Sequence, residues 1–335
     1  MNKRALAARM LANTGLLRLA RAAAPWSGVL ALNYHRIGSA ANSNYDHGLW
    51  SADADSFAWQ LDYLRSRLDI ITFEQLPEVL SRRRGRYALI TFDDGYRDNY
   101  EVAFPILEAA GVKATFFVAT GYIDQPEIPW WDEIAWLVRT SERDRIDLPG
   151  WLDQPVRFDD PDREQAVRCL LRRYKQLPAD QTTTFVDAVA GACQRPRCSS
   201  DQGRRLWMSW DMLREMNAAG MAIGAHTVSH PVLANLDESR QQHEIDQSSR
   251  RIESELKQPV TLFSYPVGGL EHFNDTTRSC LQRAGMRYAA SYYGGYRRLD
   301  DWDDLDVRRI AIEADTDRDQ FRAIVDLPQV FARPG

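Results

Sequence analysis

Short apolar runs rich in β-branched and aromatic residues alternate along the chain with longer segments whose apolar residues recur every three to four positions. The first pattern is typical of buried strands and the second of amphipathic helices. We expect strands at residues 29–35, 87–92, 113–119, 221–225, 260–266 and 287–291, and helices at 54–67, 100–111, 239–256 and 274–285. This alternation predicts an α/β protein with a parallel sheet, either open or closed into a barrel.

The pattern changes between about residues 124 and 205. This stretch contains "IPWWDEIAWLVRT" and the charged segment "DREQAVRCLLRRYKQL", both with helical periodicity. It is too long to be a plain loop between two strands. We therefore predict a helical insertion at 124–205 within a single domain that spans residues 25–335.

The first 24 residues carry five basic side chains and no acidic one. Arginines interrupt every apolar run before it reaches the length of a signal peptide or a transmembrane helix, which predicts a cytoplasmic chain. The segment reads as a basic amphipathic helix. Such a helix either packs on its own domain, the more common case, or lies on the anionic inner surface of a membrane.

Composition narrows the classes of function. The chain has 335 residues, of which 44% are hydrophobic, enough for a large core. Its net charge of −5 gives no electrostatic reason to bind nucleic acid. The four cysteines form no CxxC pair, so we expect ordinary thiols and no zinc site or disulfide built from them.

Ionisable side chains gather at the ends of three predicted strands. His35 closes the first strand, Asp93 and Asp94 follow the strand at 87–92, and His226 and His230 follow the strand at 221–225. The carboxyl ends of parallel strands meet on one face of the sheet. Two histidines and a carboxylate are a common set of ligands for a divalent metal ion. Alternatively, the aspartates cap a helix and the histidines are structural.

Two of these segments carry a resemblance to a known family. "TFDDGY" at 91–96 and "HTVSH" at 226–230 look like the first two motifs of the NodB-homology polysaccharide deacetylases, carbohydrate esterase family 4. The similarity runs from "LNYHRI" to "VRRIAI", and the insertion is its least typical part.

The resemblance implies a distorted (β/α) barrel of about seven strands. It also implies an enzyme that removes acetyl groups from N-acetylated sugars with a metal-activated water. By this likeness Asp93 is the general base, and Asp94, His226 and His230 bind the metal ion, which would be Zn²⁺, Co²⁺ or Ni²⁺.

The sequence departs from the better-known members at two points. They carry a late histidine as the acid, but no histidine follows His272 here. In the subset that resembles poly-N-acetylglucosamine deacetylases, the acid comes from an early "YH" motif, which Tyr34 and His35 match. In "FSYPVGG", Tyr265 stands where those members have an arginine that orients the aspartate. The sequence therefore does not identify the residue that orients Asp93. Tyr265 or Arg309 could line the pocket instead, or either could be structural.

Three further residues have weaker assignments. Backbone N–H groups of Gly95 and Tyr96 could stabilise an oxyanion, as the family likeness suggests. Trp131, with its neighbours in "WWD", could stack on a sugar or belong to a core.

We therefore expect a metal-dependent deacetylase of an N-acetyl-hexosamine in a cell-surface polysaccharide or its lipid-linked precursor. Removal of another small acyl group, O-acetyl or N-formyl, is the alternative reaction. A sugar-binding module that has lost catalysis is the alternative class. The sequence predicts neither the sugar nor the oligomeric state.

Overall fold

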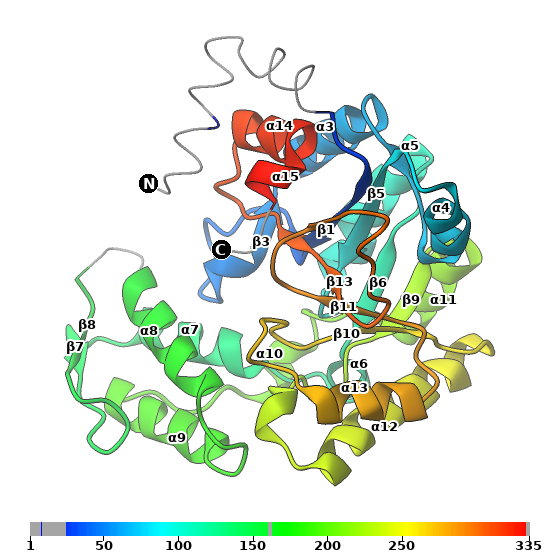
Figure 1. Ribbon diagram of the computed structural model, residues 1–335. Helices are drawn as coiled ribbons and strands as arrows, with labels where there is room; N and C mark the ends of the chain where they lie inside the picture. Colours follow the sequence, from blue (N-terminus) through cyan, green and yellow to red (C-terminus); the bar gives the residue numbers. More distant parts are fainter. Residues whose placement is uncertain (1–7, 9–24, 160–162, 333–335) are drawn as a thin grey trace.

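The computed structural model describes residue 8, residues 25–159 and residues 163–332. At its centre, parallel strands curl into a barrel that carries helices on its outside (Figure 1). In order around the barrel the strands are β1 (Gly28–Tyr34), β5 (Arg86–Phe92), β6 (Thr115–Val118), β9 (Ala222–Ala225), β10 (Leu262–Ser264), β11 (Tyr288–Ser291), β13 (Val307–Arg308) and β14 (Ile310–Ala311). The predicted α/β class and parallel sheet are confirmed.

The segment 307–311 closes the barrel. β13 pairs with β11 and β14 pairs with β1, both in parallel, and Arg309 lies between the two short strands. If β13 and β14 are taken as one interrupted strand, seven strands of the described chain form the barrel. β9 and β10 are paired through a single pair of residues, Ala225 and Phe263. The barrel is therefore distorted, as the family resemblance implied.

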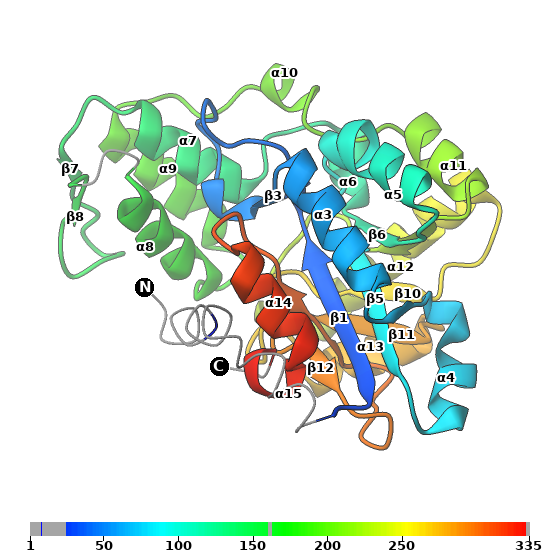
Figure 2. The ribbon, with the colours of Figure 1, turned by 90° about the horizontal axis from the view of Figure 1, so that it is seen from above.

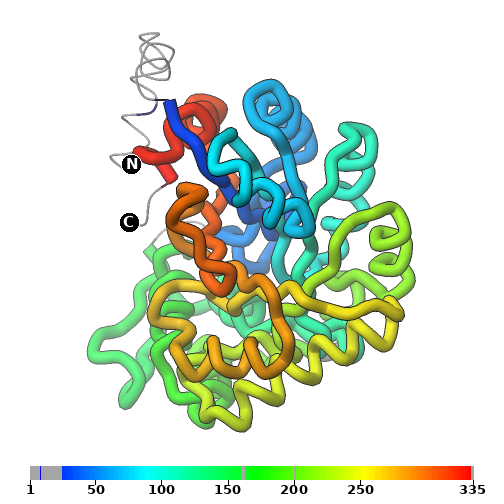
Figure 3. The backbone as a smooth tube through the Cα atoms, turned by 45° about the vertical axis from the view of Figure 1, so that its right-hand side comes forward, coloured from blue at the N-terminus to red at the C-terminus, as the bar shows by residue number. Residues whose placement is uncertain are grey.

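Helices cover the outside of the barrel (Figure 2). They are α3 (Ala54–Arg65), α4 (Leu76–Arg82), α5 (Phe104–Ala110), α11 (Trp210–Ala218), α12 (Glu238–Leu256), α13 (Asp275–Arg283), α14 (Arg318–Asp326) and α15 (Pro328–Phe331). α14 lies beside α3, where Tyr63 donates a hydrogen bond to Asp326 (Figure 3). The last helices therefore pack against the first helix of the barrel.

Further short strands and turns complete the described elements. They are β2 (Arg36–Ile37), β3 (Trp50–Ala52), β4 (Asp69–Ile70) and β12 (Tyr296–Arg297), with turns at His47–Leu49, Phe73–Gln75, Asn99–Ala103 and Leu233–Asn235. The predicted helix at 100–111 differs from the structure, where α5 begins at Phe104 after a π-helical turn. Pro105 lies at the start of α5, where its missing N–H is not needed.

The period of two along each strand separates two parts of the core. On β5, Ala88, Ile90 and Phe92 face the outer helices, while Tyr87 and Leu89 belong to the cluster inside the barrel. Residues near α4 complete that inner cluster at the amino-terminal end of the barrel. The inward row of β5 continues with Thr91 and Asp93, so the barrel interior becomes polar toward its carboxyl-terminal end.

Residues 119–221 connect β6 to β9 and include the predicted insertion. Their further elements are α6 (Thr120–Asp124), α7 (Trp130–Thr140), β7 (Arg145–Ile146), β8 (Val156–Arg157), α8 (Glu164–Lys175), α9 (Thr182–Cys193) and α10 (Ser200–Gly203). Apolar side chains of α7, α8 and α9, such as Ile134, Leu170 and Phe185, form a hydrophobic core of their own. This lobe lies beside the barrel (Figures 1 and 2). The small antiparallel ribbon of β7 and β8 was not predicted.

The predicted basic segment 1–24 lies outside the described residues, apart from Ala8. Of the helices that the structure describes, none combines the length and the hydropathy needed to cross a membrane.

Candidate active site

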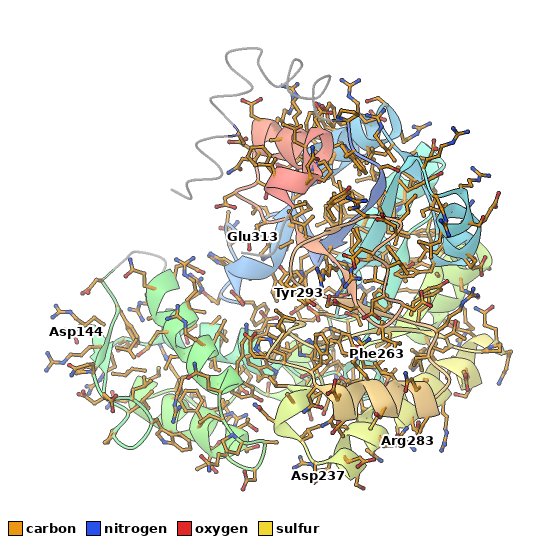
Figure 4. The ribbon with its side chains drawn as sticks, viewed as in Figure 1. Asp144, Asp237, Phe263, Arg283, Tyr293 and Glu313 are labelled. Atoms are coloured by element: carbon orange, nitrogen blue, oxygen red, sulfur yellow. The ribbon has the colours of Figure 1, made fainter. Side chains whose placement is uncertain are left out.

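A cavity of about 1000 Å³ opens at the carboxyl-terminal ends of the barrel strands. Its lining includes the residues that directly follow five of these strands: His35 after β1, Asp93 and Asp94 after β5, His226 after β9, Tyr265 after β10 and Tyr292 after β11. The exposed segment that begins at Glu313, two residues after β14, also lines it. Glu313 lies on the side of the barrel that faces the lobe carrying Asp144 (Figure 4). The opposite wall comes from α8 and from the turn around His47.

Asp93 is buried and fully engaged on one of its oxygens. Asn33 and Ser264 donate hydrogen bonds to Oδ2 at 3.1 and 3.2 Å, and Arg309 Nη2 donates to the same oxygen at 2.7 Å. Among the described residues, Arg309 Nη1 is the only donor to Oδ1, at 2.7 Å. Because a carboxylate oxygen can accept about two hydrogen bonds, Oδ1 keeps the capacity to accept a proton.

Arg309 supplies the support for Asp93 that the sequence left open. Its guanidinium is completely buried and also donates to Asn33 Oδ1, Ser264 Oγ and the Ser291 carbonyl. Burial alone would raise the pKa of Asp93, but Arg309, and then His226, lower it well below its usual range. Asp93 is therefore held as an anion in a fixed orientation.

Asp94, His226 and His230 converge on one point. The Nε2 atoms of His226 and His230 each lie 3.4 Å from Asp94 Oδ1, and all three residues are buried. Their ligand atoms lie within 4.8 Å of one another. Asp94 and His230 have φ values of 76° and 55°, which turn their side chains out of the regular strand direction and into the cluster.

The donor set fits a divalent metal ion. His226 donates from Nδ1 to the Ser264 carbonyl at 2.8 Å, which fixes the tautomer and leaves a lone pair on Nε2. Burial and the nearby His226 lower the pKa of His230 to about 3, so its imidazole is neutral, as a ligand must be. Nδ1 of His230 has no hydrogen-bond partner among the described residues, and the ring instead packs edge-on against Trp131 at 4.4 Å.

Electrostatics of the other two ligands agree with a cation at this point. Burial would raise the pKa of Asp94, but the hydrogen bond from His226 and the charges of His35 and His230 lower it. Burial would lower the pKa of His226, yet Asp93 and Asp94 raise it. The two buried carboxylates thus attract positive charge, and a metal ion between Asp94 and the two histidines would supply it.

The loop that carries His230 is fixed from outside by Glu244 on α12. This carboxylate accepts hydrogen bonds from the backbone N–H groups of Val228 and Ser229 at 2.8 and 3.0 Å, and from the Ser229 hydroxyl at 2.6 Å. Thr227 Oγ1 accepts from the N–H of His230 at 3.0 Å. Sequence reasoning missed Glu244, because its role depends on the packing of a helix against a loop.

His35 is half-buried in the cavity wall. Its backbone is held on both sides, by a hydrogen bond to Ser51 Oγ at 3.0 Å and by one from Asn99 Nδ2 at 2.6 Å. Its ring packs edge-on against Tyr292 at 5.4 Å. His35 lines the same cavity as Asp93 and Asp94.

Two other histidines, His47 and His272, also line the cavity. His47 contacts the Ser43 carbonyl through Nε2 at 2.8 Å, and His272 accepts from the N–H of Gly269 at Nδ1. Each of these rings therefore has one nitrogen engaged in holding its own loop.

Gly95 and Tyr96 do not line the cavity. Gly95 has φ of 93° and its Cα faces Val118 so closely that a Cβ would lie 3.2 Å from Cγ1, so glycine suits the turn. Tyr96 is buried and donates from its hydroxyl to Asp132 Oδ2 at 2.7 Å. The side chain of Tyr96 therefore ties the turn to the insertion.

Trp131 and Tyr265 lie in the cavity wall but are buried and engaged. Trp131 donates from its indole to the Tyr96 hydroxyl at 2.7 Å, and its ring supports His230. Tyr265 donates to the Leu305 carbonyl at 2.8 Å, and its ring stacks on Phe273 at 3.9 Å. These contacts favour the core interpretation of Trp131 and a structural role for Tyr265.

Tyr292 also lines the cavity, and the sequence analysis did not predict this. It follows the predicted strand at 287–291, so the rule that strand ends carry the chemistry could have identified it. Its ring contacts His35, and burial, followed by the charges of Glu313 and Asp93, raises the pKa of its phenol.

Comparison with known sequences and structures agrees with this picture. The profile of the polysaccharide deacetylase family matches residues 81–146 and 156–289, more than half of the chain. YxkH of Bacillus subtilis (strain 168), whose description as a polysaccharide deacetylase is provisional, is 22% identical over 199 residues. The match covers 59% of this chain but only 42% of YxkH.

Solved structures share the fold. Deacetylase PplD of Streptococcus pyogenes, solved with acetate, has a TM-score of 0.57 at 19% identity, covering 93% of this chain and all of that one. IcaB of Ammonifex degensii has a TM-score of 0.56 at 20% identity, with coverages of 91% and 98%. A de-N-acetylase of Aggregatibacter actinomycetemcomitans has a TM-score of 0.54 at 15% identity, and the match covers 86% of this chain and 96% of that one.

The profile match spans both the aspartate pair after β5 and the histidine pair after β9, and the barrel that positions them is shared with these structures. The chain therefore belongs to the polysaccharide deacetylase family.

Proposed function

We propose that this protein is a metal-dependent deacetylase that hydrolyses the N-acetyl group of an N-acetyl-hexosamine, in a cell-surface polysaccharide or its lipid-linked precursor. The observation that carries the proposal is the pairing of Asp93 with the cluster of Asp94, His226 and His230 at one end of the cavity. A buried base beside a complete ligand set has no use in a protein that only binds sugar.

In this proposal Asp94, His226 and His230 would hold a divalent ion, most simply Zn²⁺, with Co²⁺ or Ni²⁺ as substitutes. When bound, such an ion lowers the pKa of water and polarises the acetamide carbonyl. The donor atoms support it, since two imidazole nitrogens and one carboxylate oxygen face a common centre.

The protein's own groups would move the protons. Asp93 accepts the proton of the attacking water at Oδ1, the oxygen with free acceptor capacity, while Arg309 keeps the carboxylate in place. Collapse of the tetrahedral adduct breaks the C–N bond, and His35 donates a proton to the leaving nitrogen. The products are acetate and the free amine of the sugar.

The likeness to named relatives supports deacetylation in particular. PplD is described as a deacetylase and was solved with acetate, and a further structural neighbour is described as a de-N-acetylase. A cytoplasmic location and contact of residues 1–24 with the inner membrane surface stay predictions from the sequence.

The test is release of acetate from a panel of substrates. The purified protein, loaded in turn with Zn²⁺, Co²⁺ and Ni²⁺, is incubated with N-acetylated oligosaccharides and with O-acetylated and N-formylated analogues, and products are identified by mass. We expect acetate and a free amine from at least one N-acetylated oligosaccharide. Turnover of the O-acetylated or N-formylated analogues alone would contradict N-deacetylation and would identify removal of that other acyl group as the reaction.

A further inference from the structure

One wall of the cavity is positively charged. Arg168, Arg172 and Lys175 on α8 all line the cavity, and their spacing of four and three residues places them on one face of the helix. We call these three residues the α8 basic face. They come from the insertion, whereas the catalytic groups come from the barrel.

The charges of this face lack close carboxylate partners among the described residues. Neither Arg172 nor Lys175 forms an ion pair with any residue in the described part of the chain, and Arg168 has only a 3.7 Å contact with Glu164. Elsewhere in the insertion, Arg139 and Arg197 contact carboxylates at 2.6 and 2.8 Å. Within the described part of the chain, the cations of the α8 basic face thus lack ion pairs as close as those of Arg139 and Arg197.

Lys175 is the most enclosed of the three. It is half-buried, and burial lowers the pKa of its ammonium group, although Asp46 and Glu271 act in the opposite direction. A partly desolvated ammonium without a contact ion is costly, and an anionic ligand group would offset that cost.

Acidic side chains also line the cavity, among them Asp46 and, at the start of α8 itself, Glu164. Glu313 and Asp315, which follow β14, and Glu271, in the loop after β10, line the same cavity. Glu271 acts on the charge of Lys175, and Arg168 acts on that of Glu313, so these carboxylates lie within electrostatic range of α8. An anionic group of a substrate would be attracted by the α8 basic face and repelled by the carboxylates elsewhere on the rim.

We propose that the α8 basic face binds a phosphate group of the glycan substrate, close to the sugar whose N-acetyl group reaches Asp93. Two guanidinium groups and an ammonium group match the charge and the several acceptor oxygens of phosphate. The inference rests on the proposed function for the reaction but concerns a separate part of the cavity. The phosphate could belong to a phosphodiester chain or to the diphosphate of a lipid carrier.

The first experiment measures binding and does not depend on turnover. Calorimetric titrations use di-N-acetylchitobiose and its 1-phosphate with the Asp93→Asn variant, alone and combined with Arg172→Gln and Lys175→Gln. We expect the phosphate to strengthen binding roughly tenfold, and the combined variant to lose this gain. Equal affinity for the two ligands, or a gain that persists in the combined variant, would overturn the proposal.

The second experiment measures kcat/KM for three substrates: di-N-acetylchitobiose, its 1-phosphate and a prenyl diphosphate-linked analogue. The quantity compared is the ratio of kcat/KM for each phosphorylated substrate to that for the neutral one. Arg172→Gln/Lys175→Gln should bring the ratio of phosphorylated to neutral substrate toward one, and added salt should do the same in the wild type. Arg84→Gln removes an exposed charge near the amino-terminal end of β5 and should leave the ratio unchanged.

The two experiments separate the two proposals. A higher kcat/KM for the prenyl-linked analogue than for the 1-phosphate would identify a lipid carrier as the source of the phosphate group. Equal values would identify a phosphate within the glycan. If phosphate-dependent binding is present but no substrate is deacetylated, the proposed reaction fails and the phosphate site stands. If both substrates lose activity equally in the double variant, α8 has only a structural role.

Discussion

At the scale of single residues, Asp93 and Asp94 are neighbours with different surroundings. Asp93 continues the inward row of β5 and is held by Arg309, Asn33 and Ser264. Asp94 has φ of 76° and turns toward the two histidines. The chain thus places two carboxylates side by side in different environments, because one is paired with a guanidinium and the other faces His226 and His230.

Arg309→Lys tests the support of Asp93. A lysine has three donors and cannot reproduce the paired contacts of the guanidinium with both carboxylate oxygens. We expect kcat to fall by roughly 10²-fold, with KM and metal content nearly unchanged, because positioning of the base matters in the transition state. The measurements are steady-state kinetics and metal analysis.

Arg297→Lys is the matched control. Arg297 is also buried and contacts a carboxylate, Asp306, at 2.7 Å, but neither lines the cavity. The Arg297→Lys variant should have a lower free energy of unfolding than the wild type without a comparable loss of kcat. Equal losses of kcat in the two variants would reduce Arg309 to a structural residue.

His35→Gln tests the proton donor. The variant should keep its metal ion and lose kcat on an N-acetylated sugar, but lose much less on an activated aryl ester, whose leaving group needs no proton. His272→Gln, which changes another histidine of the cavity wall, should not distinguish the two substrates. Equal losses of His35→Gln on both substrates would return His35 to a structural role.

The residue types at strand ends could be predicted from the sequence, but their partners could not. The aspartate and histidine pairs follow clear apolar runs, so their convergence could be inferred before the structure was known. Arg309 lies 216 residues from Asp93 between two strands of two residues each, too short to give a period-two pattern. Its contact with Asp93 depends on closure of the barrel, which no local pattern encodes.

At the scale of elements, α12 and the loop after β9 act as one unit. The loop contains two residues with positive φ, Thr227 and His230, a conformation that side chains rarely adopt without external support. Glu244 supplies that support through three hydrogen bonds. We infer that the helix sets the position of the second histidine.

Glu244→Gln should therefore weaken metal binding. The amide keeps one acceptor oxygen but loses the charge and the second oxygen, so the loop loses part of its anchor. We expect the metal affinity to fall by roughly tenfold, measured by competition with a chelator. Glu238→Gln changes an exposed carboxylate at the start of the same helix and should have no such effect. Wild-type affinity in Glu244→Gln would show that the loop holds its shape without it.

At the scale of the whole molecule, a buried polar network joins the insertion to the barrel. Asp132 on α7 accepts hydrogen bonds from the Tyr96 hydroxyl and from the backbone N–H of Asp46. Burial raises the pKa of Asp132 to about 7, although Arg36 and these hydrogen bonds act against it. The junction next to the site is therefore sensitive to pH in the physiological range.

The sign of this effect can be tested on stability. Unfolding returns the pKa of Asp132 to about 3.9, so between about pH 4 and 7 the folded state keeps a proton that the unfolded state releases. Stability from this group falls as the pH rises through that window, by at most about 4 kcal/mol, and is level above it. The free energy of unfolding of wild type minus that of Asp132→Asn should decrease over the same window. Parallel curves from pH 4 to 8 would contradict the raised pKa.

The fold as a whole was partly predictable. Six strands and their parallel arrangement could be predicted, because each strand is buried on both faces, reads as a continuous apolar run and alternates with helical segments. Closure of the barrel and the separate core of the insertion were not predictable in this way. Both depend on contacts between distant segments, such as β14 with β1 and α7 with α9.

The central claim is that adjacent aspartates have separate roles, a base at Asp93 and a metal ligand at Asp94. Asp93→Asn and Asp94→Asn are matched changes at neighbouring buried positions, and both are tested for metal content and for acetate release from the best N-acetylated substrate. We predict that Asp93→Asn keeps its metal ion and loses about 10²–10⁴-fold in kcat, whereas Asp94→Asn loses the metal ion and activity together. Loss of the ion from Asp93→Asn, or a fully loaded Asp94→Asn, would contradict the account.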